Sequence, residues 1–185
     1  MIRKILHRIA DRLPCRIISA QPGEPYLERY YVATLFGRSI YLHHFVESDP
    51  ARGLHDHPWA KAFSVVLAGW YYEQTRTGLR KVRWFNRLSG DTFHRVILPR
   101  DWSTNGRLGA DGHKVYERSD KAQSCWTLFV HSAERVKAWG FLKPMTGDPS
   151  IVWVPWNYPA NGAASSGEWW KTAPLGRNTD GRVRA

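Results

Sequence analysis

The chain has 185 residues, which is enough for one domain with a buried core. Its 27 Lys and Arg against 16 Asp and Glu give a net charge of +11, which favours acidic partners: nucleic acid, phosphorylated molecules or small carboxylates. Two isolated cysteines, Cys15 and Cys125, argue against a disulfide framework and favour a reducing, cytoplasmic setting.

Residues 1–14 are predicted to form an amphipathic helix. Basic residues lie between apolar ones at helical spacing, and Pro14 ends the pattern; the apolar positions are Ile2, Ile5, Leu6, Ile9 and Leu13. We expect this stripe to pack on the domain, although a basic amphipathic helix also suits a membrane surface or nucleic acid. The sequence contains no apolar run of transmembrane length, and we expect no membrane partner.

Residues 15–159 are predicted to form an all-β domain. Short runs rich in β-branched and aromatic residues alternate with glycine turns, and the clearest of these runs are 28–48, 63–75, 90–98 and 125–131. A turn is expected at Gly37-Arg38. Neither βαβ alternation nor an internal repeat is present. The pattern therefore favours a small antiparallel β-barrel of the jelly-roll type.

Two regions depart from this rhythm. Residues 99–124 are polar and are predicted to form a long connection, which in a compact domain is usually functional or disordered. Residues 160–185 are rich in Gly, Ser, Ala and Arg, which predicts a flexible tail. Trp169 and Trp170 are the exception in this tail and are candidates for docking on the body or on a partner.

Three histidines form a candidate metal site. His55 and His57 are two residues apart, so on a strand both imidazoles point to the same face. His94 follows a glycine turn at the start of another predicted strand, and pairing of the two strands would bring it to the same place. Neutral imidazoles bind transition metals, and three protein ligands leave positions open for water, dioxygen or substrate.

The order Gly53…His55-x-His57…Gly69 followed by Gly90…His94 resembles the two motifs of the cupin superfamily, over roughly residues 30–142. The wider sequence pattern, which includes GWYYE and WTLFVH, also resembles that of small single-domain cupin-like proteins of phage and bacterial genomes. The resemblance implies a jelly-roll barrel that holds one divalent metal ion.

One position departs from the cupin pattern. The first cupin motif usually adds a glutamate a few residues after its second histidine, where this chain has Lys61 and Ala62. Asp56 is expected to point to the other face of the strand and is not counted as a ligand. The resemblance then implies a three-histidine site like that of thiol-dioxygenase-like cupins, in which the metal is iron; Zn, Ni and Mn are the alternatives.

We therefore expect a mononuclear metal oxygenase or dioxygenase that acts on a small or acidic substrate. One alternative is a sugar-nucleotide isomerase or epimerase of the cupin type, which can use a His base and a Tyr acid without metal. The other is a non-catalytic cupin scaffold that binds nucleic acid or a protein. Cupins often pair through their sheets, so a homodimer is a plausible assembly.

Further residues near the two motifs are candidates for catalysis. Glu73, Tyr71 and His43 are candidate proton-transfer groups, and His131 is a weaker candidate ligand at the end of a predicted strand. Arg95 is a candidate anchor for an anionic substrate, since arginine binds carboxylate or phosphate with two parallel hydrogen bonds.

Overall fold

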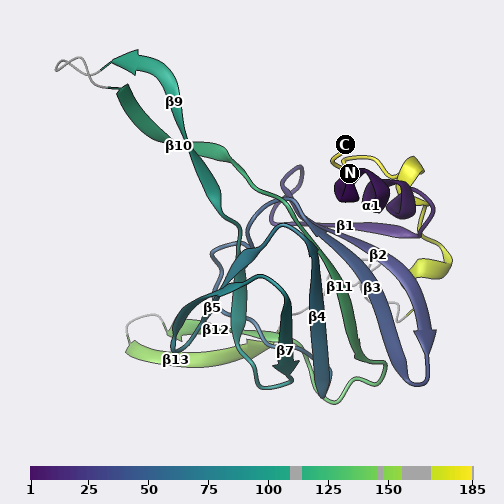
Figure 1. Ribbon diagram of the computed structural model, residues 1–185. Coiled ribbons are helices and arrows are strands. Elements are labelled where there is room, and N and C mark those ends of the chain that lie inside the picture. The colour runs from purple at the N-terminus through teal and green to yellow at the C-terminus, as the bar shows by residue number, and fades with distance from the viewer. Residues whose placement is uncertain (109–113, 146–147, 156–167, 185) are drawn as a thin grey trace.

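The computed structural model describes residues 1–108, 114–145, 148–155 and 168–184 (Figure 1). Within these ranges, one helix precedes a run of antiparallel strands, and two short 3-10 turns follow. The elements are α1 (Ile2–Ala10), β1 (Cys15–Ser19), β2 (Pro25–Leu35), β3 (Arg38–Phe45), β4 (Lys61–Ala68), β5 (Tyr71–Thr75), β6 (Gly78–Val82), β7 (Phe85–Ser89), β8 (His94–Ile97), β9 (Arg100–Leu108), β10 (Lys114–Ala122), β11 (Cys125–Ser132), β12 (Gly140–Met145), β13 (Asp148–Pro155), η1 (Trp169–Lys171) and η2 (Gly176–Asn178).

The larger layer is a six-stranded antiparallel sheet in the order β1-β2-β3-β11-β4-β7. The predicted turn at Gly37 joins β2 to β3, where Leu35 pairs with Arg38 across a two-residue loop. Both loop residues have positive φ, 50° at Phe36 and 68° at Gly37, as the tight hairpin turn that matches strand twist requires. Local turn chemistry therefore sets the register of the first hairpin.

The second layer consists of two smaller units, β6-β5-β8 and β12-β13. His55 joins them, because it forms isolated bridges with His94 at the start of β8 and with Phe141 in β12. The backbone N–H of His55 donates to the His94 carbonyl and the N–H of His94 donates to the His55 carbonyl, both at 2.9 Å. The histidine segment is thus held between two strand units and does not form a long strand of its own.

Apolar side chains from both layers meet in a shared core. Tyr26, Leu27 and Phe45 of the larger sheet pack in one buried cluster with Tyr71 and Val96 of the smaller layer. The chain is therefore a β-sandwich of the jelly-roll type, with the all-β cupin-like architecture that the sequence predicts. In the described residues the strand pairing does not close into a continuous barrel.

Only part of the helix α1 packs on the sheet, contrary to the sequence prediction. Leu6 and Ala10 are buried against Trp126 and its neighbours on the outer face of the larger sheet. Ile2, Ile5 and Ile9 remain 53%, 47% and 46% exposed. The apolar arc of the helix is too wide for one flat contact, so half of it stays in solvent.

The described part of the C-terminal segment, residues 168–184, packs on the body, so the prediction of a flexible tail is wrong there. Trp169 is buried, and the Trp170 ring stacks on Tyr31 with the centroids 4.2 Å apart. Arg182 is buried, donates to the Tyr30 hydroxyl at 2.6 Å and forms an ion pair with Asp11 of the chain just after α1. Residues 160–167 lie outside the described residues.

The same network contains Glu28, which is fully buried. Its carboxylate accepts hydrogen bonds from the Tyr30 hydroxyl at 2.6 Å, from His44 Nδ1 at 2.8 Å and from the Val183 N–H at 2.5 Å. Burial raises the pKa of Glu28, but these hydrogen bonds outweigh burial and hold the pKa below its usual value. An ionised carboxylate thus ties the C-terminal segment to β2 and β3.

The described part of the polar stretch 99–124 is largely paired strand, not a loop. Residues 100–108 and 114–122 pair as β9 and β10, and this hairpin extends away from the sandwich (Figure 1). The run has little apolar alternation because it does not lie over the core, so sequence periodicity could not identify these strands.

Candidate metal centre

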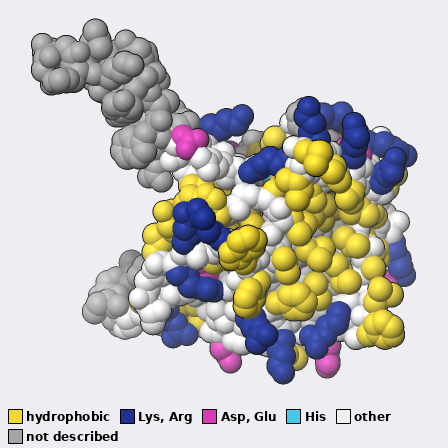
Figure 2. Space-filling model, viewed as in Figure 1, with side chains coloured by type: hydrophobic (Ala, Val, Ile, Leu, Met, Phe, Trp, Pro, Cys, Tyr) yellow, Lys and Arg dark blue, Asp and Glu magenta, His cyan; other side chains and the backbone are white. Residues whose placement is uncertain are grey.

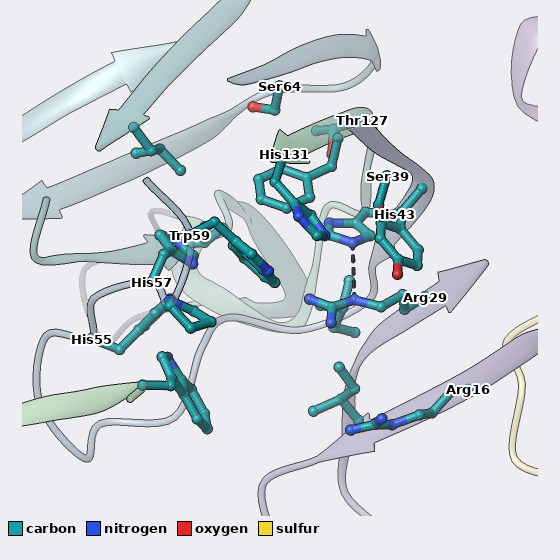
Figure 3. A pocket seen from close by; sticks show the side chains of 18 of the residues that line it. Arg16, Arg29, Ser39, His43, His55, His57, Trp59, Ser64, Thr127 and His131 are labelled. Atoms are coloured by element: carbon teal, nitrogen blue, oxygen red, sulfur yellow. Dashed lines mark hydrogen bonds between the residues drawn. The ribbon is translucent and has the colours of Figure 1, made fainter. Parts of the chain in front are cut away.

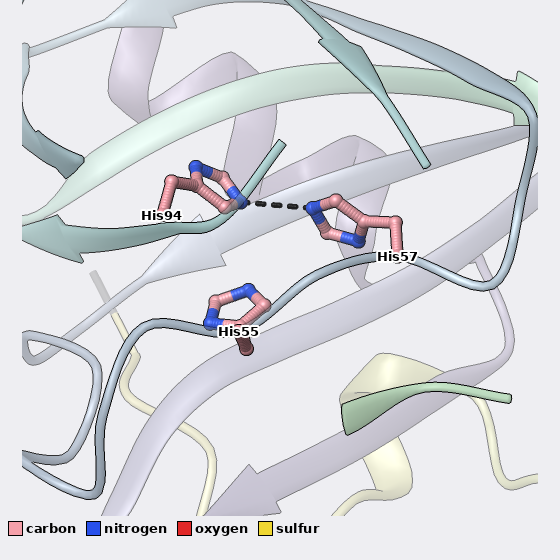
Figure 4. Close-up of side chains that lie close together, drawn as sticks. All are labelled: His55, His57 and His94. Atoms are coloured by element: carbon pink, nitrogen blue, oxygen red, sulfur yellow. Dashed lines mark hydrogen bonds between the residues drawn. The ribbon is translucent and has the colours of Figure 1, made fainter. Parts of the chain in front are cut away.

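The three predicted histidines lie together. His55, His57 and His94 each offer one ring nitrogen, and these nitrogens all lie within 4.8 Å of one another (Figure 4). His57 Nε2 and His94 Nε2 are 2.8 Å apart and are joined by a hydrogen bond. Two nitrogens bound at about 2.1 Å to one ion stand about 3 Å apart at right angles, so the spacing suits a shared ion.

Successive side chains of the segment 54–58 point to opposite sides. His55 and His57 point toward His94, whereas Asp56 points the other way, as predicted. The Asp56 carboxylate is fully buried and accepts from the Gly140 N–H at 2.8 Å, from Trp153 Nε1 at 2.9 Å and from Lys137 Nζ at 2.9 Å. Asp56 therefore anchors the segment and is not available as a ligand.

Glu73 orients His94. The Glu73 carboxylate accepts from His94 Nδ1 at 2.8 Å, from Asn86 Nδ2 at 2.6 Å and from Arg80 Nε at 2.7 Å. Burial raises the pKa of Glu73, but the hydrogen bonds from His94 and Asn86 and the charge of Arg80 lower it by more than burial raises it. The pKa is therefore below its usual value, and the carboxylate is ionised. An ionised carboxylate accepts only, which places a proton on His94 Nδ1, while Nε2 is the ring nitrogen that faces His57.

This arrangement corrects the predicted role of Glu73. It is not among the residues that line the cavity, and its carboxylate is saturated with donors, so it does not serve as a proton-transfer group. A carboxylate behind a metal-ligating histidine fixes the tautomer and raises the basicity of the ligand nitrogen. Glu73 is thus a positioning residue for the histidine cluster.

Two histidines of the cluster, His55 and His57, are neutral. Burial, helped by the nearby His94, holds the pKa of His55 and of His57 well below the usual value of 6.5. Neutral imidazole is the form that binds a metal ion. With Glu73 fixing the tautomer of His94, the donor set fits a divalent transition metal in the way that the sequence suggests.

His131 does not join the cluster, although it is buried in the same cavity. Its Nδ1 donates to the Ser132 carbonyl at 2.6 Å, and its ring stacks on Trp59 with the centroids 3.7 Å apart. Burial lowers the pKa of His131 to about 4. His131, the weaker of the predicted ligands, is therefore part of the cavity wall and is not in the histidine cluster.

A cavity of about 650 Å³ opens between the two layers and contains the histidine cluster (Figure 3). Tyr71 and His43 line it, as predicted for catalytic candidates, but Arg95 does not. Side chains alternate along β8, so Arg95 faces away from the side on which His94 and Val96 face the cavity. The cations that do line the cavity are Arg16, Arg29, Arg52, Arg135 and Lys171.

Arg29 and His43 form a pair on the cavity wall (Figure 3). Arg29 Nε donates to His43 Nε2 at 3.1 Å, and the guanidinium lies over the Tyr41 ring. Burial, followed by the charge of Arg29, lowers the pKa of His43 well below 6.5, so His43 is a neutral acceptor. The cavity thus places a cationic guanidinium beside a neutral imidazole.

The known proteins that resemble this chain are solved structures of low sequence identity. No family model matches the chain, and no curated protein matches it. Among solved structures, a cupin-2 domain protein from Rhodospirillum rubrum has 11% identity and a TM-score of 0.46, covering 68% of this chain and 72% of that one. A cupin 2 conserved barrel domain protein from Rhodopseudomonas palustris has 11% identity and a TM-score of 0.44, and it also covers 68% of this chain and 72% of that one. KdgF from Halomonas has 12% identity and a TM-score of 0.39, covering 65% of this chain and 88% of that one.

At this identity and similarity the neighbours say nothing about activity. The fold therefore rests on the strand order of the chain itself, which forms an antiparallel β-sandwich with a histidine cluster between its layers. This is the class that the two sequence motifs indicate. No helix in the described ranges is long and apolar enough to span a bilayer.

Replacing Glu73 with alanine is expected to weaken metal binding by about 10- to 100-fold, because His94 loses the partner that fixes its tautomer. Titration of the metal-free protein against a chelating dye measures the change. Glu24→Ala, at an exposed position, is the matched control and should bind as the unmodified protein does. A folded Glu73→Ala protein with unchanged affinity would contradict the positioning role.

Proposed function

We propose that the protein is a mononuclear metal oxygenase that acts on a small acidic molecule held in the cavity between the layers. His55, His57 and His94 are the proposed ligands. The observation that carries the proposal is the convergence of three imidazoles at a cavity of about 650 Å³ that arginines also line. A catalytic metal site needs such open coordination positions next to space for a substrate.

Iron is the proposed metal. Three imidazoles without a carboxylate are a neutral set, so a bound divalent ion keeps its full charge toward an anionic substrate. When bound, an iron ion supplies open positions at which dioxygen and the substrate are brought together and activated. The chain supplies the ligands, the hydrogen bond by which Glu73 orients His94, and the shape of the cavity.

The other cavity residues are proposed to bind and orient the substrate. Arg29, held by His43, and Arg16 lie where they can pair with an acidic group of the substrate. Trp59 and Trp139 flank the histidines with apolar rings and exclude water from them. Burial raises the pKa of Tyr71 to about 12, so its hydroxyl keeps its proton and can donate a hydrogen bond.

A metal-independent isomerase or epimerase is the second candidate. The observation in its favour is that a tyrosine and two further histidines, Tyr71, His43 and His131, face the same cavity. A neutral histidine can accept a proton from a carbon next to a carbonyl, while a tyrosine returns one. On this reading the three-histidine cluster is an internal hydrogen-bonded group.

Elemental analysis of protein purified without a metal-affinity column separates the two candidates. The oxygenase predicts iron close to one atom per chain, and oxygen uptake when a panel of small carboxylates and thiols is supplied. Stoichiometric zinc or nickel without oxygen uptake would reject the oxygenase. A fully folded, metal-free protein that also refuses added Fe²⁺ would reject the metal site.

A further inference from the structure

The outer face of the larger sheet carries apolar side chains that the fold does not cover. On α1, Ile2, Ile5 and Ile9 are 53%, 47% and 46% exposed. Phe63 and Val65 of β4, and Phe85 of β7, are also exposed. We call these six residues the outer apolar face. Figure 2 shows apolar side chains gathered over this side of the molecule.

The helix and the strands contribute to one surface. Leu6 and Ala10 fix α1 on the sheet by packing on Trp126, and Leu67 of β4 packs at the edge of the same cluster. Side chains at alternate positions of β4 share a face, so Phe63 and Val65 project to the side of the sheet on which Leu67 meets α1. Phe85 is the cross-strand partner of Val65 and extends the surface onto β7.

Cations surround this surface. On α1, Lys4, Arg8 and Arg12 are exposed beside the isoleucines. On the strands, Lys61 is exposed two residues before Phe63, and Arg87 is the cross-strand partner of Phe63. The only carboxylate of the first twelve residues, Asp11, is paired with Arg182. Figure 2 shows Lys and Arg side chains along the edges of the apolar area.

We propose that the outer apolar face binds the surface of an anionic lipid bilayer. An apolar stripe flanked by lysine and arginine on a helix that lies flat is the composition of an interfacial helix, in which the apolar side enters the headgroup region and the cations meet anionic lipid. A peripheral contact of this kind needs no membrane-spanning segment.

Two other occupants fit the surface less well. A second copy of the chain, paired through this face, would bring two cationic edges together at a net charge of +11 per chain. Nucleic acid would meet the cations but would leave the isoleucines and phenylalanines without a partner, since it is held chiefly by contacts to phosphate and by stacked bases.

Sedimentation with vesicles tests the proposal. The full chain is expected to sediment with vesicles of equal parts phosphatidylcholine and phosphatidylglycerol, to stay in solution with phosphatidylcholine alone, and to be released by salt. Ile5→Glu with Ile9→Glu should lower the partition coefficient at least about tenfold, because the apolar stripe becomes charged. Leu79→Glu, at an equally exposed position on β6 outside this face, should leave it unchanged.

Three results would overturn the proposal. The first is no binding to either vesicle by the folded full chain. The second is binding that the Ile5→Glu, Ile9→Glu protein retains in full. The third is a dimer by light scattering that this variant alone converts to a monomer, which would assign the face to a second copy. Arg8→Gln with Arg12→Gln, which leaves every apolar contact intact, should separately abolish the preference for phosphatidylglycerol.

Discussion

With His55, His57 and His94 as the proposed ligands, replacing His57 and His94 together with alanine is expected to abolish metal binding by the protein. Their Nε2 atoms lie 2.8 Å apart, and the substitution leaves His55 as the one remaining imidazole of the cluster. One neutral imidazole does not hold a divalent ion against chelation, whereas three that a folded protein has brought together do. Elemental analysis after dialysis measures the loss, and any oxygen uptake should fall to the level of buffer.

His131→Ala is the matched control for this double variant. His131 is also a buried histidine of the cavity, but its ring stacks on Trp59 and its Nδ1 is bound to a backbone carbonyl. The His131→Ala protein should therefore keep its metal. Retention of metal by a folded double variant would reject the site, and loss of metal from His131→Ala would show that His131 belongs to it. Circular dichroism establishes that each protein is folded.

The part of this fold that could be predicted from the sequence is the part set by local patterns. Period-two alternation and glycine turns indicate the strands, and the turn at Gly37 lies between the strands where it was expected. The spacing of His55 and His57 puts both side chains on one side of any extended segment. Pairing of that segment with His94 follows from the resemblance to the two cupin motifs, because neither pattern alone specifies a partner strand.

Roles that depend on long-range register could not be predicted. Glu73 and Arg95 both lie near a motif, and nothing local distinguishes them. The pairing of β5 with β8 places Glu73 opposite Val96 and lets its carboxylate reach His94, while Arg95 faces away. Arg29 was missed for the same reason, since only the pairing of β2 with β3 sets it opposite His43.

The two ends of the chain show the limit of composition as a guide. The C-terminal segment is rich in residues that favour disorder, yet Arg182 bonds Tyr30, which is 152 positions away in sequence. Conversely, the N-terminal stripe has the periodicity of a packed helix, yet the sheet covers only its Leu6 and Ala10 side. Burial in both cases is decided by the shape of the surface that receives the segment.

Lowering the pH from 7 to 5 is expected to destabilise the metal-free protein strongly. Burial holds the pKa of His43 well below 6.5 and that of His131 at about 4, so both stay neutral in the folded state. In the unfolded chain they bind protons below about pH 6.5. Their contribution to stability is therefore complete above pH 6.5 and is lost as the pH falls toward the folded pKa, by at most about 2 kcal/mol for each histidine at pH 5.

Urea unfolding at pH 7 and at pH 5, with a chelator present, measures this loss. His43→Gln with His131→Gln keeps polar side chains in the cavity but removes both titrating groups, so the difference in unfolding free energy between the two pH values should shrink by up to about 4 kcal/mol. His55 and His57 remain in this variant and should leave a residual dependence of the same sign. If the double variant shows the same difference in unfolding free energy between pH 7 and pH 5 as the unmodified protein, His43 and His131 are already protonated in the folded protein at pH 5, and the prediction is wrong.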